Sequence, residues 1–238
     1  MPAPYGLEIT DNCATCRWKS EGFFCDLPPA TLKSFEAAKF TSSYPSGAVL
    51  FVEGQAPRGV YQLCKGRVKL TMTSAEGKSI ILRIAEPGEL IGLNSAVSGR
   101  AFELTAETLE PCQVNFIKRD AFLRLMREHP EASVNATEQL SNDYSAACVQ
   151  IRSLGLSRTA SEKIIRFLLD LANHGKETHD GVRVNVSLTH EEIAQVVGVS
   201  RETVTRTLTE LKHKALITVK GPTVTIRDKA GMEALAAA

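Results

Sequence analysis

The chain lacks a long hydrophobic run. Although 43% of its 238 residues are hydrophobic, no uninterrupted apolar stretch approaches the roughly 20 residues that a membrane-spanning helix needs. The opening stretch, MPAPYGLEITDN, lacks the basic and apolar regions of a secretory signal peptide. We therefore expect a cytoplasmic protein with no membrane partner, and its length allows two domains and a sizeable core.

The sequence also lacks an excess of charge of either sign. The 28 Lys and Arg residues nearly balance the 27 Asp and Glu residues, so any nucleic-acid footprint must come from cations placed locally. No nucleophile–base set, P-loop or dinucleotide fingerprint occurs. The segment GELIGLNSAVSG contains glycines, but it lacks the strand–turn–helix context that a dinucleotide site requires. These absences argue against an enzyme.

Cysteine, by contrast, occurs in a pattern that suits metal binding. Cys13, Cys16 and Cys25 lie in CATCRWKSEGFFC, and Cys112 lies far downstream in ETLEPCQV. A structural disulfide framework is not expected in a reducing compartment, so metal or redox use explains this set better. Four thiolates satisfy one [4Fe–4S] cluster. They also suit structural zinc or a disulfide switch between two of them.

The N-terminal half of the chain predicts a β-rich domain. Residues 1–27 form a cysteine-bearing segment with little periodicity, and residues 28–129 begin with a short helix at PPATLKSFEAAKF. From Tyr44 to Phe116, short β-rich runs alternate with turn glycines, which is typical of an antiparallel sandwich or barrel. AEGK is a plausible hairpin tip. Cys64, in YQLCKG, alternates with strand residues and is expected to be a core residue.

A long helix is predicted over residues 130–156, after a break at Pro130. It carries apolar residues spaced four and three apart, which form an a/d seam: Leu140, Tyr144, Ala147, Ile151 and Leu154. The spacing fits a helix packed on its own domain as well as a parallel dimer helix. An adjoining DNA-binding unit favours the dimer. Cys148 is expected to pack within this helix.

Residues 157–238 predict a winged helix-turn-helix domain. An amphipathic helix covers 158–173, and NHGKETHDG follows as a loop. The segment ALITVKGPTVTIRD then predicts two short strands on either side of Lys220 and Gly221, which would form the wing.

The helix-turn-helix itself is indicated by three local signals in register. Thr189 with Glu192 three residues later forms a capping box at a helix start. Gly198 supplies the turn, where a positive φ costs little only for glycine. Ser200 can cap the second helix. Because turn, caps and apolar positions all agree, we expect a helix pair here.

The start of the second helix carries side chains that match base edges. Recognition helices use their N-terminal residues in the major groove. Arg matches the O6 and N7 acceptors of guanine, and Glu accepts from cytosine N4. Thr can contact phosphate or a thymine methyl group. Glu202 and Arg206 lie four residues apart, so an ion pair between them is the alternative to base contacts. The predicted DNA-binding residues are Ser200, Arg201, Glu202, Thr203, Thr205 and Arg206.

From about Phe35 to Ile226 the chain resembles the CRP/FNR family of bacterial transcription regulators. GRVKLTMTSAEGKSIILRIAEPGELIGL looks like that family's cyclic-nucleotide-binding-type β-roll, and the predicted long helix matches its dimerisation helix. RETVTR is similar to the CRP recognition helix, whose base contacts fall on Arg201, Glu202 and Arg206. The resemblance implies an α+β fold and a homodimer that binds pseudo-palindromic double-stranded DNA with TGTGA-like half-sites and contacts RNA polymerase.

The resemblance also bears on what the sensor domain binds. Family members that bind cyclic AMP place a Glu on the ribose and an Arg on the phosphate. Aligned on Ile91, these places fall on Leu93 and near Glu103, whose charge would repel a phosphate, so cyclic AMP is not expected. FNR carries an N-terminal C-x2-C-x5-C, similar to C-x2-C-x8-C here, and a fourth cysteine in a context that matches Cys112.

The resemblance therefore implies a [4Fe–4S] cluster on Cys13, Cys16, Cys25 and Cys112 that responds to redox state, oxygen or nitric oxide. Loss of the cluster would release the N-terminal segment and shift the equilibrium of the 130–156 helix. The alternative is a regulator of the same type without a cluster, controlled by thiol oxidation or by a small ligand in the β-roll.

Overall fold

The computed structural model describes residues 4–10, 12–16, 25, 27–156 and 159–237. The chain divides into two compact units, residues 1–147 and 148–238, and the division falls inside one long helix, α4 (Pro130–Leu156). Within the described ranges no helix is both long and apolar enough to cross a membrane. The predicted α+β fold, with a β-roll, a long helix and a helix-turn-helix domain, is confirmed.

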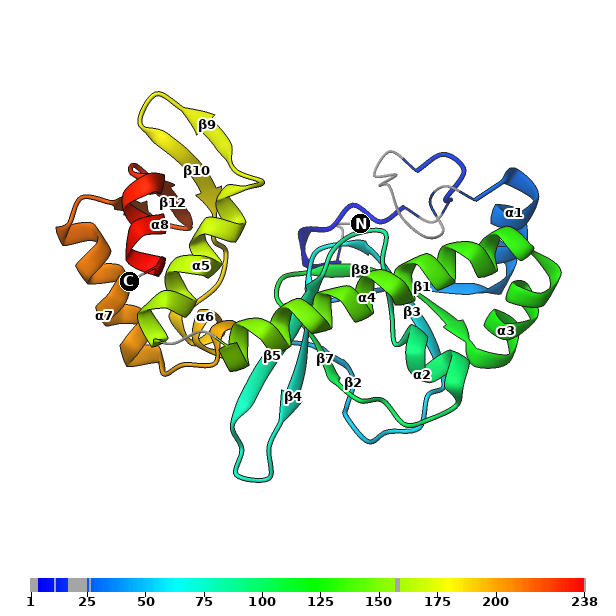
Figure 1. The fold of residues 1–238 in the computed structure, drawn as a ribbon. Coiled ribbons are helices and arrows are strands. Elements are labelled where there is room, and N and C mark those ends of the chain that lie inside the picture. Colours follow the sequence, from blue (N-terminus) through cyan, green and yellow to red (C-terminus); the bar gives the residue numbers. More distant parts are fainter. Residues whose placement is uncertain (1–3, 11, 17–24, 26, 157–158, 238) are drawn as a thin grey trace. The chain divides into compact units, whose positions relative to one another are not determined.

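The first unit is a β-roll of two four-stranded antiparallel sheets (Figure 1). Its strands are β1 (Lys39–Tyr44), β2 (Val49–Phe51), β3 (Gly59–Lys65), β4 (Val68–Thr73), β5 (Ser79–Ala85), β6 (Leu90–Ile91), β7 (Thr105–Thr108) and β8 (Cys112–Lys118). One sheet has the order β1-β8-β3-β6 and the other the order β2-β7-β4-β5. The predicted hairpin tip is present between β4 and β5, where Gly77 has φ +82°.

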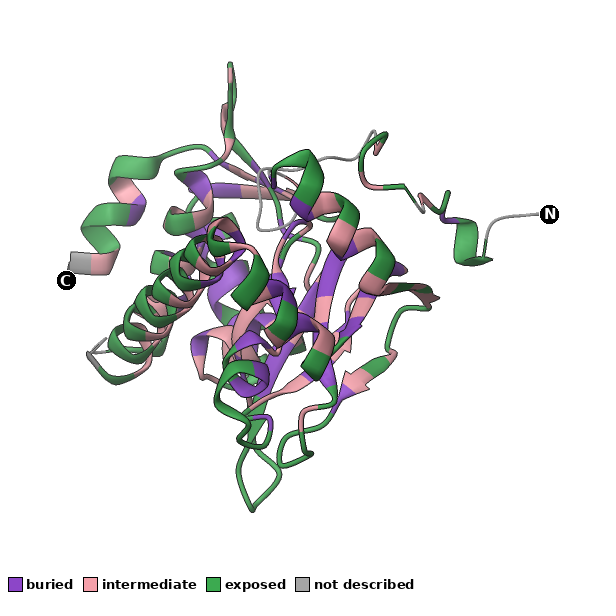
Figure 2. Cartoon of the chain, turned by 90° about the vertical axis from the view of Figure 1, so that its right-hand side faces the viewer, coloured by how far each residue is buried: buried purple, intermediate pink, exposed green. Residues whose placement is uncertain are grey.

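Strand alternation gives each strand of the β-roll two chemically distinct faces. Leu63 of β3 and Val114 of β8 belong to a core that both sheets share. In this core the rings of Phe51 and Phe102 stack with their centroids 3.8 Å apart. Figure 2 shows the buried residues, in purple, concentrated on these strands. The neighbouring β8 residues therefore point to the opposite face of their sheet, which we call the outer face.

Helices cover part of the outer face and build a second core. These helices are α1 (Pro29–Ala38), α2 (Leu93–Ser98), α3 (Arg119–Glu128) and the first turns of α4. Phe35 and Phe122 are fully buried there against Val60 and Ile117, which alternate with the inward residues of β3 and β8. The predicted helix break before α4 is present, because α3 ends at Glu128.

The second unit is a winged helix-turn-helix domain. Its elements are α5 (Ala160–Ala172), β9 (Lys176–Thr178), β10 (Gly181–Asn185), α6 (His190–Val197), α7 (Arg201–His213), β11 (Ile217–Lys220), β12 (Thr223–Ile226) and α8 (Lys229–Ala237). The predicted wing is the β11–β12 hairpin. The prediction of a plain loop after α5 was wrong, because that stretch contains β9 paired with β10. Helix α8 was not predicted.

Candidate DNA interface and cysteine site

The N-terminus of α6 is fixed by the predicted capping box. The Thr189 hydroxyl accepts a hydrogen bond from the Glu192 amide at 3.2 Å, and the Glu192 carboxylate accepts one from the Thr189 amide at 2.8 Å. Two amides that lack partners within the helix are thereby satisfied. A second link, not predicted, joins His190 Nδ1 to the Thr205 hydroxyl of α7 at 2.9 Å.

The turn between α6 and α7 depends on glycine. Gly198 has φ +69°, and a Cβ atom at this position would lie 2.5 Å from Cδ2 of Leu154. The Ser200 hydroxyl then accepts a hydrogen bond from the Thr203 amide at 3.2 Å and caps α7. The predicted turn and cap are therefore present, and they set the direction in which α7 begins.

The predicted base-reading residues lie on the solvent side of α7. Arg201, Glu202, Thr205 and Arg206 are exposed, whereas Thr203 is half-buried. The opposite face is buried in the domain core through Val204, Thr207, Leu208 and Leu211. The pKa of the Glu202 carboxyl is lowered by hydrogen bonds from its own amide and from Ser200, and by the Arg201 charge. Glu202 is thus an acceptor at neutral pH.

The described residues of the N-terminal cysteine segment lie on the outer face of the β-roll. The Thr10 amide donates to Gln113 Oε1 at 3.0 Å, and Gln113 Nε2 donates to the Thr10 carbonyl at 2.7 Å, which ties the segment to β8. Leu7 and Leu27, which flank the cysteines, are both buried. Asn12 Oδ1 accepts hydrogen bonds from the amides of Ala14 and Thr15, which forms an Asx turn. Cys13 lies within this turn, and Cys16 follows it directly.

Cys64 lies close to the N-terminal cysteines, which the sequence analysis did not predict. It occupies the irregularity between Leu63 and Lys65 where β3 pairs with β8, and such bulges re-aim a side chain. The pKa of the Cys64 thiol is raised to about 12, mainly by burial and also by the neighbouring thiols of Cys13, Cys25 and Cys16, and the Lys39 charge opposes this rise. The sequence does carry one signal of this position: polar residues alternate along β3 and β8, and strand alternation places them together on the outer face.

Nitrogen donors point at three of these four sulfur atoms. The pairs are Lys39 Nζ to Cys13 Sγ at 3.3 Å, Gln62 Nε2 to Cys25 Sγ at 4.0 Å and Asn115 Nδ2 to Cys64 Sγ at 3.1 Å. Burial raises the pKa of the Cys13 thiol, and the Lys39 charge opposes that shift. Donors of this kind stabilise sulfur that carries negative charge, and they tune bound clusters.

The structure does not bring Cys112 to the other three predicted ligands. As the first residue of β8 it faces the shared core between the sheets and is fully buried. Its thiol donates to the carbonyl oxygens of Glu110 at 3.1 Å and Arg67 at 3.4 Å. Burial raises the pKa of Cys112 to about 11. The sequence could not show this, because the face that β8 presents depends on its register.

The donor set fits a soft metal centre. Thiolate ligands select iron–sulfur clusters or zinc over hard cations. In the part of the chain that the structure describes, no three Cys, His, Asp or Glu side chains are spaced to hold a metal ion as they stand. A metal would therefore have to draw the thiols of Cys13, Cys16, Cys25 and Cys64 together, and the side chain of Gln62 already contacts the sulfurs of both Cys25 and Cys64, each at 4.0 Å.

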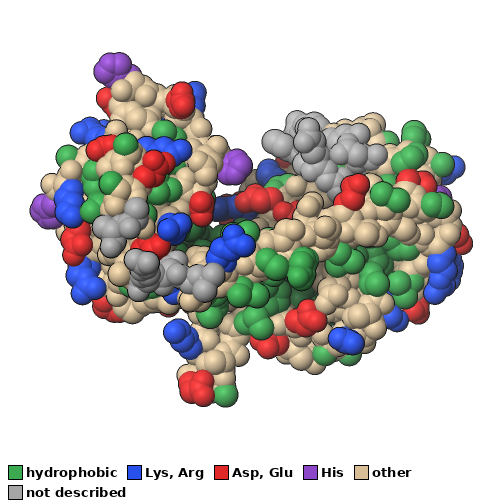
Figure 3. All heavy atoms as spheres, viewed as in Figure 1, with side chains coloured by type: hydrophobic (Ala, Val, Ile, Leu, Met, Phe, Trp, Pro, Cys, Tyr) green, Lys and Arg blue, Asp and Glu red, His purple; other side chains and the backbone are tan. Residues whose placement is uncertain are grey.

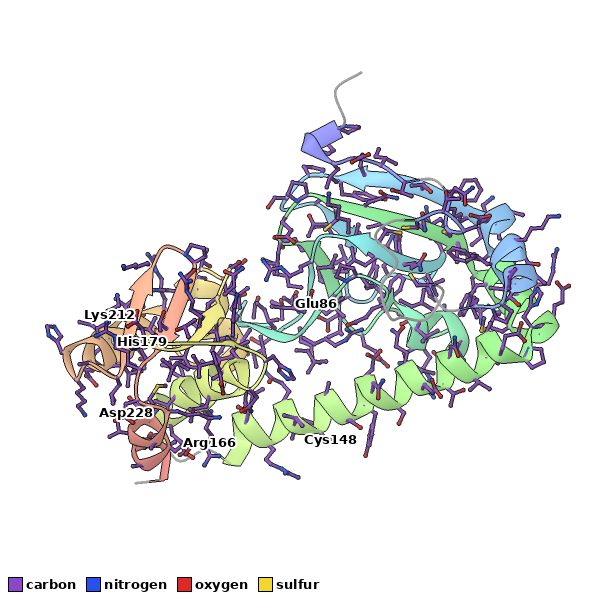
Figure 4. All side chains as sticks on the ribbon, turned by 90° about the horizontal axis from the view of Figure 1, so that it is seen from above. Glu86, Cys148, Arg166, His179, Lys212 and Asp228 are labelled. Carbon is purple, nitrogen blue, oxygen red and sulfur yellow. The ribbon has the colours of Figure 1, made fainter. Side chains whose placement is uncertain are left out.

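The predicted seam residues of α4 have different surroundings. Tyr144 is 73% exposed and Ile151 is 67% exposed, whereas Leu140 packs partly against the outer-face core and Leu154 packs on Gly198. Figure 3 shows hydrophobic side chains, in green, gathered beside α4 on the β-roll. Cys148, labelled in Figure 4, is exposed on α4, and its expected packing in the dimer helix stays a prediction.

A cavity of about 320 Å³ lies within the β-roll unit, between the sheet of β4 and β5, helix α2 and helix α4. Arg83, which lines it, forms ion pairs with Glu89 and with Asp143, the latter at 3.2 Å. Asn94 donates to the Glu103 carboxylate, also on the wall, at 2.8 Å. The positive charge of Arg83 is therefore already neutralised by the carboxylates of Glu89 and Asp143.

Comparison with known proteins identifies both domains. The family model described as a cyclic nucleotide-binding domain matches residues 41–129, and the model described as a Crp-like helix-turn-helix domain matches residues 162–235. Together they account for both folded units.

Individual relatives extend over nearly the whole chain. The CRP-like cAMP-activated global transcriptional regulator of Mycobacterium tuberculosis is 27% identical, over 87% of this chain and 92% of that protein. The transcriptional activatory protein AadR of Rhodopseudomonas palustris is 29% identical, over 95% of this chain and 94% of that protein. The solved structure of FixK2 from Bradyrhizobium japonicum, 22% identical, has the same fold, with a TM-score of 0.72 over 84% of this chain and 98% of that chain.

Proposed function

Because the chain belongs to the CRP/FNR family of transcription regulators, we propose that it binds a pseudo-palindromic DNA site as a homodimer and reads each half-site with α7. The observation that carries the proposal is the exposed row Arg201, Glu202 and Arg206 at the start of a helix whose entry is fixed by a cap. Two Arg side chains suit guanines and Glu suits a cytosine, which agrees with TGTGA-like half-sites. As a family member it would also contact RNA polymerase.

The test is selection of binding sites from randomised duplexes, followed by anisotropy titrations of variants. Arg206→Ala should weaken binding by about 1–3 kcal/mol, roughly 5- to 150-fold, and relax the preference at one base pair. Lys212→Ala is the control: it keeps the base-reading row, so any weakening should be uniform across sequences. Selected half-sites without a TGA core would contradict the proposed reading.

We propose that DNA binding is controlled by a [4Fe–4S] cluster held by Cys13, Cys16, Cys25 and a fourth thiolate from the β-roll. Support comes from the gathered thiols and the nitrogen donors directed at them. When bound, such a cluster supplies a centre that oxygen or nitric oxide can dismantle. The chain's own part is to hold the cysteine segment on the outer face, through Thr10 and Gln113 among other residues.

The outer-face core offers a physical route from the cysteines to the dimer helix. It contains Leu27 from the cysteine segment and Ala132 and Ala136 from α4. The partly buried side chains of Cys13 and Leu140 pack against it. Because packed cores transmit strain, release of the segment would alter the packing of α4. The α4 helix is therefore the element whose two states the sensor would bias.

The alternative control is by thiol oxidation or by a small ligand in the β-roll, and the cavity beside α4 is the observation that favours a ligand. Anaerobic purification with an absorption spectrum and with iron, sulfide and zinc assays separates these possibilities. A brown protein with about four irons per chain supports the cluster. A colourless protein whose DNA affinity is the same with and without oxygen supports the ligand.

A further inference from the structure

We infer that the fourth thiolate of the metal centre is Cys64 and that Cys112 is not a ligand. This inference rests on the proposed cluster and assigns one of its ligands. It differs from the assignment that the resemblance implies. Three observations carry it: the face of the sheet on which each sulfur lies, the hydrogen-bonding partners of each sulfur, and the room around each one.

The two cysteines lie on opposite faces of the same sheet. Gln62 of β3 pairs with Asn115 of β8, and these residues face outward, where the cysteine segment lies. Cys64 shares that face, since its sulfur contacts the side chains of Asn115 and Gln62, and Gln62 also contacts the sulfur of Cys25. Cys112 is three residues before Asn115, so strand alternation directs it into the shared core. A sheet one backbone thick separates it from Cys13.

The partners of the two sulfurs differ in kind. Asn115 Nδ2 donates to Cys64 Sγ at 3.1 Å, and the Cys64 thiol itself donates only at the longer distances of 3.9 and 4.0 Å, to the backbone and side-chain oxygens of Gln62. An N–H donor favours sulfur as an anion or as a metal ligand. Cys112 instead donates to two carbonyl oxygens at 3.1 and 3.4 Å. Two acceptors favour a neutral thiol, because a thiolate there would face oxygen lone pairs.

The room around the sulfurs points the same way. A Cβ atom at Gly66 would lie 2.5 Å from Cys112 Sγ, so the backbone of the β3–β4 turn already closes over this sulfur. Cys64 is only half-buried, as are Cys13, Cys16 and Cys25. Four half-buried thiols on one surface can close around a metal centre, whereas Cys112 would have to leave the core first.

The experiment compares full-length variants purified and reconstituted without oxygen, by iron and acid-labile sulfide content and by absorption. Both Cys64→Ala and Cys13→Ala should lose most of their iron. Cys112→Ala should keep a nearly wild-type content. Far-ultraviolet circular dichroism checks the fold of each variant, and Cys64→Ser and Cys112→Ser replace any alanine variant that fails to fold.

Retained iron in Cys64→Ala, or loss of iron in a folded Cys112 variant, would overturn the assignment. If the wild-type chain itself holds no iron after reconstitution, the proposed cluster fails. Cobalt(II) titration of the reduced chain then still decides the ligand, because the sulfur-to-cobalt charge-transfer band grows with the number of thiolate ligands. A weaker band in Cys64→Ser and an unchanged band in Cys112→Ser support the assignment, and the reverse pattern overturns it.

Discussion

At the residue scale, Gly198 shows how the absence of a side chain positions the DNA-reading helix. Its φ of +69° lies in the left-handed region, and Leu154 fills the space that a Cβ atom would occupy. Gly221, in the wing, also has a positive φ, +58°, but nothing lies within 4 Å of its Cβ position. A side chain at Gly221 would therefore meet backbone strain alone, whereas a side chain at Gly198 would meet both backbone strain and a steric clash with Leu154.

Gly198→Ala should destabilise the protein more than Gly221→Ala. The left-handed conformation costs an L-residue about 1–2 kcal/mol, and only Gly198→Ala must also displace Leu154. Chemical denaturation of both variants measures the difference in the free energy of unfolding. A larger loss in Gly221→Ala would contradict the packing described for the turn.

The residues that could be predicted from the sequence are those whose partners are close in the chain. Thr189 finds Glu192 three residues away, and Ser200 finds Thr203 at the same spacing. The surroundings of Cys64 could not be predicted in this way, because they depend on contacts such as Thr10 with Gln113, which are 103 residues apart. The fourth cysteine was assigned from a sequence context that does not record the face of the strand.

At the scale of the element, α4 carries apolar side chains that its own chain leaves exposed. Tyr144 and Ile151, one heptad apart and therefore on the same helix face, are each more than half exposed. Exposed aromatic and β-branched side chains on one helix face suit a helix–helix interface. The a/d pattern predicted from the sequence is consistent with this exposure, but the partner of the seam stays a prediction.

Tyr144→Glu should weaken the proposed homodimer. A charge at the seam would have to lose its water on association, and we expect the dimer Kd to rise by tenfold or more, about 1.4 kcal/mol. Asn142→Glu is the matched control, because Asn142 is exposed and lies about 200° around the helix from Tyr144. Sedimentation equilibrium measures both. Equal effects of the two substitutions would place the interface elsewhere.

At the scale of the whole molecule, the proposed sensor and the proposed dimer helix share one core. Leu27, two residues after Cys25, is buried in the same cluster as Ala132 and Ala136 of α4. Leu70 is buried to a similar extent in the core between the sheets, which contains no α4 residue. A comparison of these two leucines therefore separates general stability from transmission of the signal.

Removal of the metal by a chelator should change the DNA affinity of the wild-type chain and of Leu70→Ala, but should change that of Leu27→Ala much less. Both substitutions should cost about 2–5 kcal/mol of stability, so measurements belong at a temperature where both variants are folded. The coupling is reciprocal, and operator DNA should therefore shift the metal affinity of the wild-type chain by the same factor. If Leu70→Ala abolished the response as fully as Leu27→Ala, the signal would not pass through the outer-face core.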